Sequence, residues 1–286
     1  MATASISGAT ITITAIAPGN ASVTVTASDP GGLKGEQSLQ VMVPNRAPQP
    51  TGTIPPITVP VDQAETVDAS SYFAEPDGET LTYSATSSNT AAATVTVAGG
   101  TVAVTGLAKG TANVMVTATD PGGLAATQTF EVTVPNRAPL AGDPIPEMEV
   151  FVGDAAEVDV SEHFSDPDGD ALVYSASSSN GNVARVSVSG ATVRVEAAAQ
   201  GSATVTVTAT DPEGLSAESS FEVTVPNRVP LAGDPIPEMA VFVGDAESFD
   251  ASEHFSDPDG DELAYSASSS NRNVARVSVS GATVRV

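Results

Sequence analysis

The chain has 286 residues and a formal charge of −25, from 35 acidic residues against 10 Lys and Arg. This balance argues against nucleic acid, whose phosphates need Lys and Arg, and against an anionic membrane surface. The absence of cysteine excludes disulfides, thiolate chemistry and Cys-based zinc sites.

The sequence repeats itself at a fixed interval. Pro-Asn-Arg-x-Pro places its Asn at positions 45, 136 and 227, which are 91 residues apart. We therefore divide the chain into the C-terminal part of a repeat (1–44), two complete repeats (45–135 and 136–226) and the N-terminal part of a repeat (227–286). The first part supplies strands D to G and the last supplies strands A to E. The whole is expected to be a window on a longer array.

Within the repeat 136–226, short segments alternate apolar and polar residues with the period of a half-buried strand. The expected strands are Glu149–Val152, Ala156–Val160, Leu172–Ala176, Ala184–Val188, Thr192–Val195, Ala203–Ala209 and Phe221–Val225. A two-residue hairpin at Ser189-Gly190 is expected between the fourth and fifth.

No window shows a sustained helical period. Seven or eight short strands in each 91-residue repeat, separated by turns, indicate an all-β chain of tandem immunoglobulin-type β-sandwiches. No segment approaches the ~18 consecutive apolar residues of a membrane span, so direct membrane insertion of this segment is not expected.

An acidic loop recurs once in each repeat, between strands B and C. It reads Asp166-Pro167-Asp168-Gly169-Asp170, and recurs as Glu75–Glu79 and Asp257–Asp261. Carboxylates at alternate positions can point several oxygens at one spot, which suits calcium, a cation that takes six to eight oxygen ligands. In an immunoglobulin-type sandwich this loop shares one end with Asp211, between strands F and G, and with the linker residue Asn136. These three segments are therefore expected to meet at the junction between consecutive domains.

The unit resembles the bacterial cadherin-like (dystroglycan-type) and immunoglobulin-like tandem repeats of large surface and adhesin proteins. The resemblance is carried by Asn136-Arg137-Ala138-Pro139, by the acidic loop with Tyr174-Ser175-Ala176, and by Ala209-Thr210-Asp211-Pro212 before Phe221–Val225. In cadherins a linker Asn, an Asp-x-Asp loop and an Asp ahead of the last strand bind calcium between domains.

The resemblance implies calcium ligands at matching positions in every repeat. They are Asn45, Glu75, Asp77, Glu79, Asp120, Asn136, Asp166, Asp168, Asp170, Asp211, Asn227, Asp257, Asp259 and Asp261, with Asp29 as the counterpart of Asp120 and Asp211 in 1–44. If calcium binds, its affinity is expected in the weak extracellular range of ~10⁻⁴–10⁻³ M. The alternative is that Arg137 and backbone N–H groups satisfy the acids in a purely structural turn.

These observations favour a non-enzymatic structural extender of a bacterial extracellular adhesin or surface fibre, rigidified at its junctions by calcium. Its first partners are neighbouring repeats of the same chain. A second reading is a filament subunit that polymerises head-to-tail, because the part-domains 227–286 and 1–44 of two copies could complete each other. A third is an adhesive module for a host or surface glycan or protein. No Ser motif or pair of carboxylates across a cleft indicates an enzyme.

Overall fold

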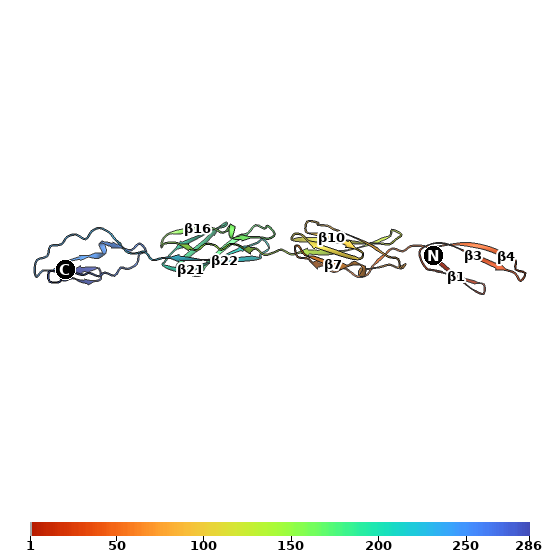
Figure 1. Ribbon diagram of the computed structural model, residues 1–286, viewed down its shortest axis with the longest axis horizontal. Helices are drawn as coiled ribbons and strands as arrows, with labels where there is room; N and C mark the ends of the chain where they lie inside the picture. The colour runs from red at the N-terminus through yellow and green to blue at the C-terminus, as the bar shows by residue number, and fades with distance from the viewer. Residues whose placement is uncertain (1) are drawn as a thin grey trace. The chain divides into compact units, whose positions relative to one another are not determined.

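A computed structural model of the chain describes residues 2–286 and is built almost entirely of β-strands (Figure 1). The chain divides into two compact units, Met1–Asn136 and Arg137–Val286.

The first 44 residues form two antiparallel hairpins. In one, β1 (Ala2–Ser7) pairs with β2 (Thr10–Ala15). In the other, β3 (Gly19–Ser28) pairs with β4 (Lys34–Val43) over their full length.

Residues 45–135 form a sandwich of two sheets. The three-stranded sheet has the order β10 (Ala93–Ala98), β11 (Thr101–Gly106), β7 (Ala64–Asp68). The four-stranded sheet has the order β6 (Ile57–Thr58), β13 (Ala125–Val134), β12 (Gly110–Thr119), β9 (Thr82–Ser87), and β6 runs parallel to β13. A small ladder joins β5 (Gln49–Pro50) to β8 (Phe73–Ala74), which follows the 3-10 turn η1 (Ala69–Tyr72).

Residues 137–226 repeat this plan in the second unit. One sheet holds β16 (Ala155–Asp159), β20 (Thr192–Ala197) and β19 (Ala184–Ser189). The other holds β15 (Met148–Glu149), β22 (Ser216–Val225), β21 (Gly201–Thr210) and β18 (Val173–Ser178), and Figure 1 shows β16 and β21 in separate layers. The small ladder joins β14 (Leu140–Ala141) to β17 (Phe164–Ser165), after η2 (Ser161–His163).

Residues 227–286 keep the small ladder and part of one sheet. The ladder joins β23 (Leu231–Ala232) to β25 (Phe255–Ser256), next to η3 (Ala251–Glu253). The sheet holds β24 (Ser248–Asp250), β27 (Thr283–Arg285) and β26 (Ser278–Ser280). Residues 264–269 match β18 in the repeat but form no strand. In the complete repeat β18 pairs with β21, and 227–286 contains no strand at that place.

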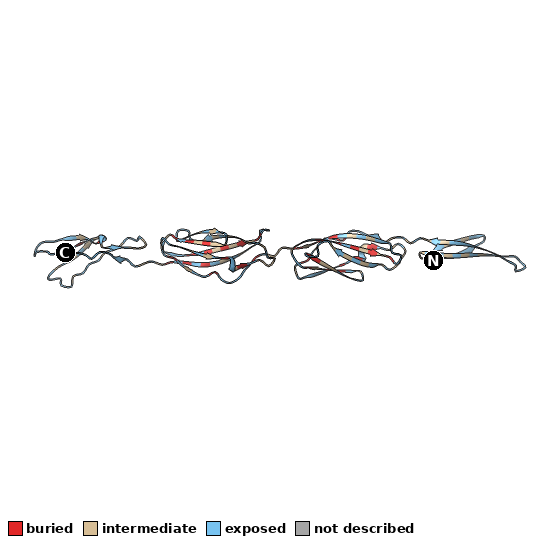
Figure 2. Ribbon diagram, turned by 90° about the horizontal axis from the view of Figure 1, so that it is seen from above, coloured by how far each residue is buried: buried red, intermediate tan, exposed pale blue. Residues whose placement is uncertain are grey.

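The two cores are built mainly of Val. Alternate residues of the long strands point inward, so that Val114, Val116, Val205 and Val207 have no exposed surface. One aromatic pair closes each core, with the rings of Phe164 and Tyr174, for example, 5.9 Å apart between centroids. In Figure 2 the buried positions gather in the two complete sandwiches, whereas none of residues 2–44 is buried.

The structure confirms the all-β sandwich and shifts some predicted strands. Of the expected strand Glu149–Val152 only Glu149 is in a strand, because Gly153, with a φ of 84°, turns the chain there. The predicted hairpin turn lies one residue later, at Gly190-Ala191, since Ser189 pairs with Thr192. Each complete repeat has nine strands when three of only two residues are counted.

The equivalent positions Phe130 and Leu39 test how much each long hairpin contributes. Phe130 of β13 is 3% exposed, and Leu39 of β4 is 41% exposed. We expect Phe130→Ala to lower the free energy of unfolding by about 3–5 kcal/mol, because it leaves a cavity in a closed core. Leu39→Ala should cost clearly less. Calorimetric unfolding of both variants checks this, and equal losses would contradict the burial pattern.

Candidate functional site

The register of the small ladder places an Arg opposite an acid. Gln49 pairs with Ala74 in the β5–β8 ladder. Three residues further out along each strand, Arg46 therefore falls opposite Asp77. The backbone N–H of Arg46 donates to Oδ2 of Asp77 at 2.7 Å, and its Nε donates to Oδ1 at 2.7 Å. The guanidinium also donates to the carbonyl of Pro76. Both oxygens of the central acid are thus engaged by the linker.

The same clasp forms twice in the second unit. Asp168 accepts from the backbone N–H of Arg137 at 2.7 Å and from its Nε at 2.9 Å. Asp259 accepts from the same two groups of Arg228 at 2.6 and 2.7 Å. The carboxylates of Asp168 and Asp259 keep only 2% of their side-chain surface exposed. We call this pairing the Arg–Asp clasp.

The hairpin turns after β12 and β21 each hold a second buried acid. Asp120 is 4% exposed, and its Oδ1 accepts from the backbone N–H of Leu124 at 2.9 Å. Its Oδ2 accepts from the Nδ2 of the linker residue Asn45 at 2.8 Å. Asp211 is equally buried and accepts from the N–H of Leu215 at 2.9 Å. This acid therefore shapes its own turn in both repeats.

The linker, the acidic loop and the hairpin turn meet at one end of the sandwich 45–135. Thr82 pairs with Thr119 where β9 begins and β12 ends, so the loop before β9 lies beside the turn that contains Asp120. In the second unit Val173 pairs with Thr210 in the same way. We call the end of the sandwich where linker, loop and turn meet the head of the repeat. Linker, loop and turn therefore meet in 45–135, and in the second unit the loop and the turn lie at the same end of the sandwich.

Several oxygens at this head are buried without a hydrogen-bond donor. They are Oδ1 of Asn45, Oε2 of Glu75 and Oε2 of Glu79. The other oxygen of Glu75 accepts from the backbone N–H of Asp77 at 2.9 Å. Oδ2 of Asp166 in the next repeat is also buried without a hydrogen-bond donor. An unpaired buried acceptor costs free energy, so these atoms call for a cationic or donor partner.

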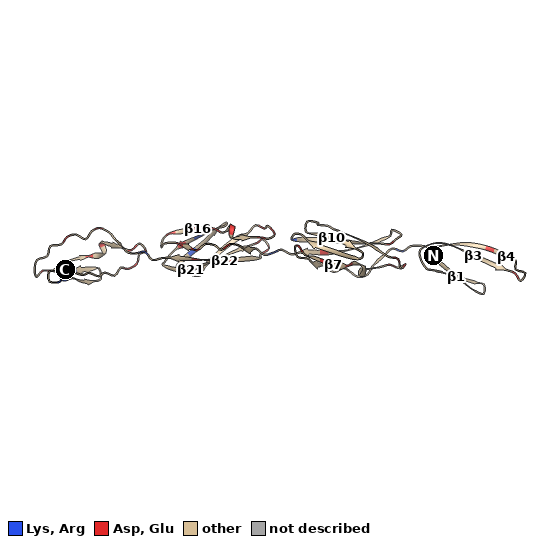
Figure 3. Ribbon diagram, in the orientation of Figure 1, with Lys and Arg blue, Asp and Glu red and all other residues tan. Residues whose placement is uncertain are grey.

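The acidic residues, drawn red in Figure 3, include two groups at the head that differ in the direction of their pKa shift. The backbone N–H of Arg46, followed by its side chain, holds the pKa of Asp77 below its ordinary value of 3.8. Arg228 lowers the pKa of Asp259 in the same way. Burial raises the pKa of Glu79 above 4.5, and the charges of Asp120, Glu75 and Asp77 raise it further. The flanking acids therefore repel each other.

The free oxygens match a hard cation in chemical kind, since all are carboxylate or amide oxygens. Asn45, Glu75 and Glu79 would hold the ion. Asp120 would support them through its hydrogen bond with Asn45. The shell is open: among residues 2–286 no three His, Asp or Glu side chains are already arranged to hold a metal ion. The ligands would therefore have to close around an ion.

The remaining predicted ligands occupy different surroundings. Asp257 accepts from the backbone N–H groups of Asp259 and Asp261 within its own loop, as Asp166 does from those of Asp168 and Asp170. Asp261 also accepts from Nε2 of Gln200 at 3.2 Å. Asp29 caps the β3–β4 turn through Leu33, in a part of the chain that contains no acidic loop. Asn227 lies in the linker directly before Arg228.

One contributor to the head was not recognised from sequence. A Cβ added to Gly122 would clash with Nδ2 of Asn45, so a glycine here leaves room for the amide that bonds Asp120. The recurrence of glycine at Gly31 and Gly122 was a signal, although the next repeat carries Glu213 at this position.

The strands, sheet order and head together define a tandem immunoglobulin-like β-sandwich protein. A sequence model described as "Bacterial Ig domain" matches residues 136–224, and one described as "Bacterial Ig-like domain (group 2)" matches residues 51–130. Each match covers one of the two complete sandwiches, so these two segments are similar to bacterial immunoglobulin-like domains. Such domains are generally non-enzymatic and typically occur in extracellular or surface proteins.

Solved structures with a similar chain path include tandem domains of animal proteins. Titin domains I67–I69 match with a TM-score of 0.42 and 12% identity, over 79% of this chain and 82% of theirs. Drosophila N-cadherin EC1-4 matches with a TM-score of 0.39 and 16% identity, over 74% of this chain and 58% of its own.

A glycoside hydrolase also appears among these neighbours. The endo-fucoidan hydrolase MfFcnA4 of family 107 matches with a TM-score of 0.29 and 14% identity, over 78% of this chain and only 37% of its own length. All these scores are low, so the similarity to bacterial immunoglobulin-like domains rests on the two sequence matches. No curated protein shows significant similarity to the chain. Among residues 2–286 there is no helix that could span a membrane.

The two pKa shifts in one loop predict opposite effects of pH on stability. Asp77 stabilises the fold above pH 3.8, and this contribution is lost as the pH falls through its lowered pKa. For Glu79 the contribution is complete below pH 4.5 and is lost as the pH rises through its raised pKa. Carboxyl-carbon NMR titration should place Asp77 below and Glu79 above their ordinary values.

Arg46→Ala should move the pKa of Asp77 part of the way back, because the backbone N–H donor remains in the variant. Arg194→Ala is the matched control, since Arg194 pairs with Glu157 and Glu196 and not with Asp77. An Asp77 titration that is the same in all three proteins would show that the clasp does not form in solution.

Proposed function

We propose that the chain is a structural extender of a bacterial extracellular adhesin or surface fibre, in which calcium stiffens the heads of the repeats. The observation that carries this proposal is the set of buried, donor-free oxygens of Asn45, Glu75 and Glu79. They lie where the linker, the acidic loop and the hairpin turn meet, so an ion held there acts on the link between repeats.

The mechanism is mechanical. The linker between repeats is short and bounded by Pro44 and Pro48, whose rings limit backbone freedom. The Arg–Asp clasp ties this linker to the loop of the repeat that follows it. A cation on Asn45, Glu75 and Glu79 would tie it further and offset the mutual repulsion of the acids. Binding to the folded state alone would also stabilise the fold by mass action, by about 1.4 kcal/mol at ten times the Kd.

The variant Glu79→Gln tests whether calcium binds at the first acidic loop, and the second acidic loop of the same chain serves as an internal control. In the full chain, calcium at millimolar concentration should shift the backbone amide NMR signals of residues 75–79 and of residues 166–170. In Glu79→Gln the response of residues 75–79 should be lost while that of residues 166–170 is retained. Without calcium the variant should melt at a higher temperature than the native chain, because a raised-pKa carboxylate has been removed.

Glu131→Gln is the matched control, since it removes the same charge from an exposed position of β13. It should leave the calcium response unchanged. If the native chain shows the same spectra and melting curve with calcium and with EDTA, the acids form a structural turn and the calcium part of the proposal fails.

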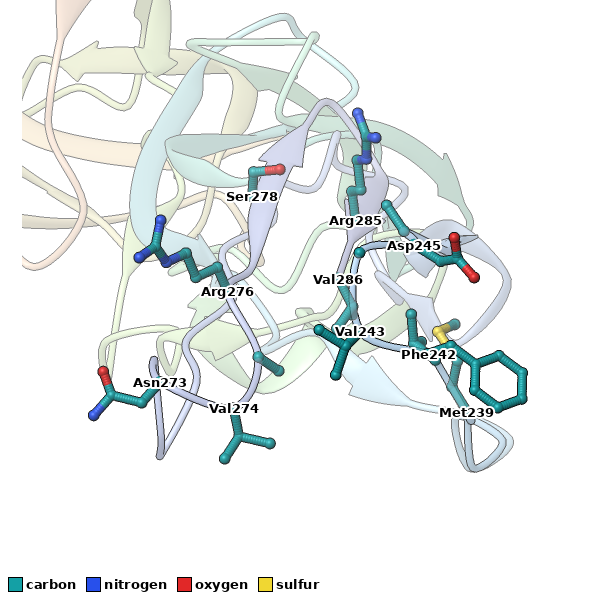
Figure 4. Close-up of a pocket in the computed structure, with 14 residues that line it drawn as sticks. Met239, Phe242, Val243, Asp245, Asn273, Val274, Arg276, Ser278, Arg285 and Val286 are labelled. Atoms are coloured by element: carbon teal, nitrogen blue, oxygen red, sulfur yellow. The ribbon is translucent and has the colours of Figure 1, made fainter.

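Head-to-tail assembly is a second candidate, favoured by two uncovered apolar surfaces. In 227–286, Phe255 is 38% exposed, whereas Phe73 and Phe164 at the same position are 7% and 6% exposed. A separate hollow in 227–286, drawn in Figure 4, is lined by Met239, Phe242 and Val243 among others.

The other surface is the β3–β4 hairpin, which has the same ten-pair register as β12–β13 and β21–β22. The residues of β3–β4 that correspond to the buried positions of β12–β13 are only half-buried or exposed. They are Ala21, Val23, Val25, Leu39, Val41 and Val43. A hairpin of this register from a second copy could take the place that β21–β22 occupies in the complete repeat.

Light scattering of the 286-residue chain over a range of concentrations tests this assembly. Its mass should rise with concentration, and Leu39→Glu should return it to the monomer by placing a charge in the new core. A native chain that stays monomeric at every concentration would rule out the assembly and leave the extender proposal standing.

A further inference from the structure

A turn of the repeat 136–226 contacts the head of the following repeat through Arg228. The guanidinium donates to the carbonyl oxygen of Val152 at 3.0 Å, in addition to its bonds with Pro258 and Asp259. Its Cζ lies 5.3 Å from the ring centroid of Phe151, which is the geometry of a cation–π contact. One side chain therefore bonds its own acidic loop and the repeat before it.

A second contact lies at the same junction. Gln200, in the turn between β20 and β21, donates from Nε2 to Oδ2 of Asp261 at 3.2 Å. Two separate turns of one repeat thus contact the linker Arg and the acidic loop of the next. Neither contact requires a metal ion.

The side chains at this junction are less exposed than the side chains at equivalent positions elsewhere in the chain. Phe151 is 39% exposed, whereas Phe242, the same position one repeat later, is 83% exposed. The side chain of Arg228 is 31% exposed, compared with 62% for Arg46. The ring and the guanidinium cover each other where both are present.

We propose that the turn Phe151–Gly153 is a docking surface for the head of the following repeat, and that Phe151 and Gln200 form with Arg228 and Asp261 a metal-independent latch. Asp261 is the counterpart of Glu79, so the latch uses one position of the third acidic loop, and it resists bending of the junction when calcium is absent. The contacts of the latch do not depend on the proposed extender function. Only the biological role of the latch, which is to stiffen the junction, rests on that proposal.

Distance measurements in EDTA separate the latch from the calcium effect. Because the chain has no cysteine, Ser187→Cys and Ser278→Cys give two nitroxide labels at equivalent exposed positions on either side of the junction. Phe151→Ala should broaden the distribution of label distances in the full chain. Phe242→Ala removes the same side chain one repeat later and should leave the distribution as in the native chain.

A gain of rigidity is the complementary test. Gln200→Lys, which introduces the residue that Lys109 supplies at the equivalent position, should add an ion pair with Asp261 and narrow the distribution. High salt should reverse this gain, because it screens exposed ion pairs.

A direct reading of the contact comes from the Nε–H proton of Arg228. The ring of Phe151 should shift its NMR signal, and Phe151→Ala should move the signal back, while the bond to Asp259 keeps its exchange slow in both proteins. The latch proposal is overturned if Phe151→Ala changes neither this signal nor the distance distribution. That outcome leaves the calcium response, measured separately on residues 75–79, untouched.

Discussion

The Arg–Asp clasp is the interaction on which the head of each repeat depends, and β-ladder register determines it. A ladder of only two residue pairs fixes which residues lie opposite each other three positions further out. A slip of one residue would turn every side chain of the strand to the other face and separate Arg from Asp. The direction in which the linker enters the sandwich is therefore set by local backbone pairing.

The clasp also decides which acids remain for another partner. Arg46 neutralises the central Asp77, while Glu75 and Glu79 on either side keep buried oxygens without donors. A loop of three alternating acids thus contains one structural member and two unsatisfied ones. The structural-turn interpretation of the sequence describes Asp77, whereas the calcium proposal concerns Glu75 and Glu79.

The alternation of Val with polar residues was enough to predict the sandwich, since period-two burial is encoded locally. The segment 264–269 shows the limit of that signal: it has the sequence of a strand but lacks the neighbour that β21 provides for β18. The meeting of linker, loop and turn followed from topology. The latch could not be predicted, because Phe151 and Arg228 are far apart in sequence and their contact depends on two side-chain orientations.

Comparison of repeats within the chain separates the role of the clasp from that of the latch. Arg and the central Asp recur at every head, as Arg46, Arg137 and Arg228 with their partners. The latch positions vary, with Pro60, Phe151 and Phe242 at one and Pro18, Lys109 and Gln200 at the other. A clasp that folds the head must be the same in each repeat, whereas a latch acts only between neighbours. Its residues can therefore change the stiffness of one junction without altering the sandwich on either side.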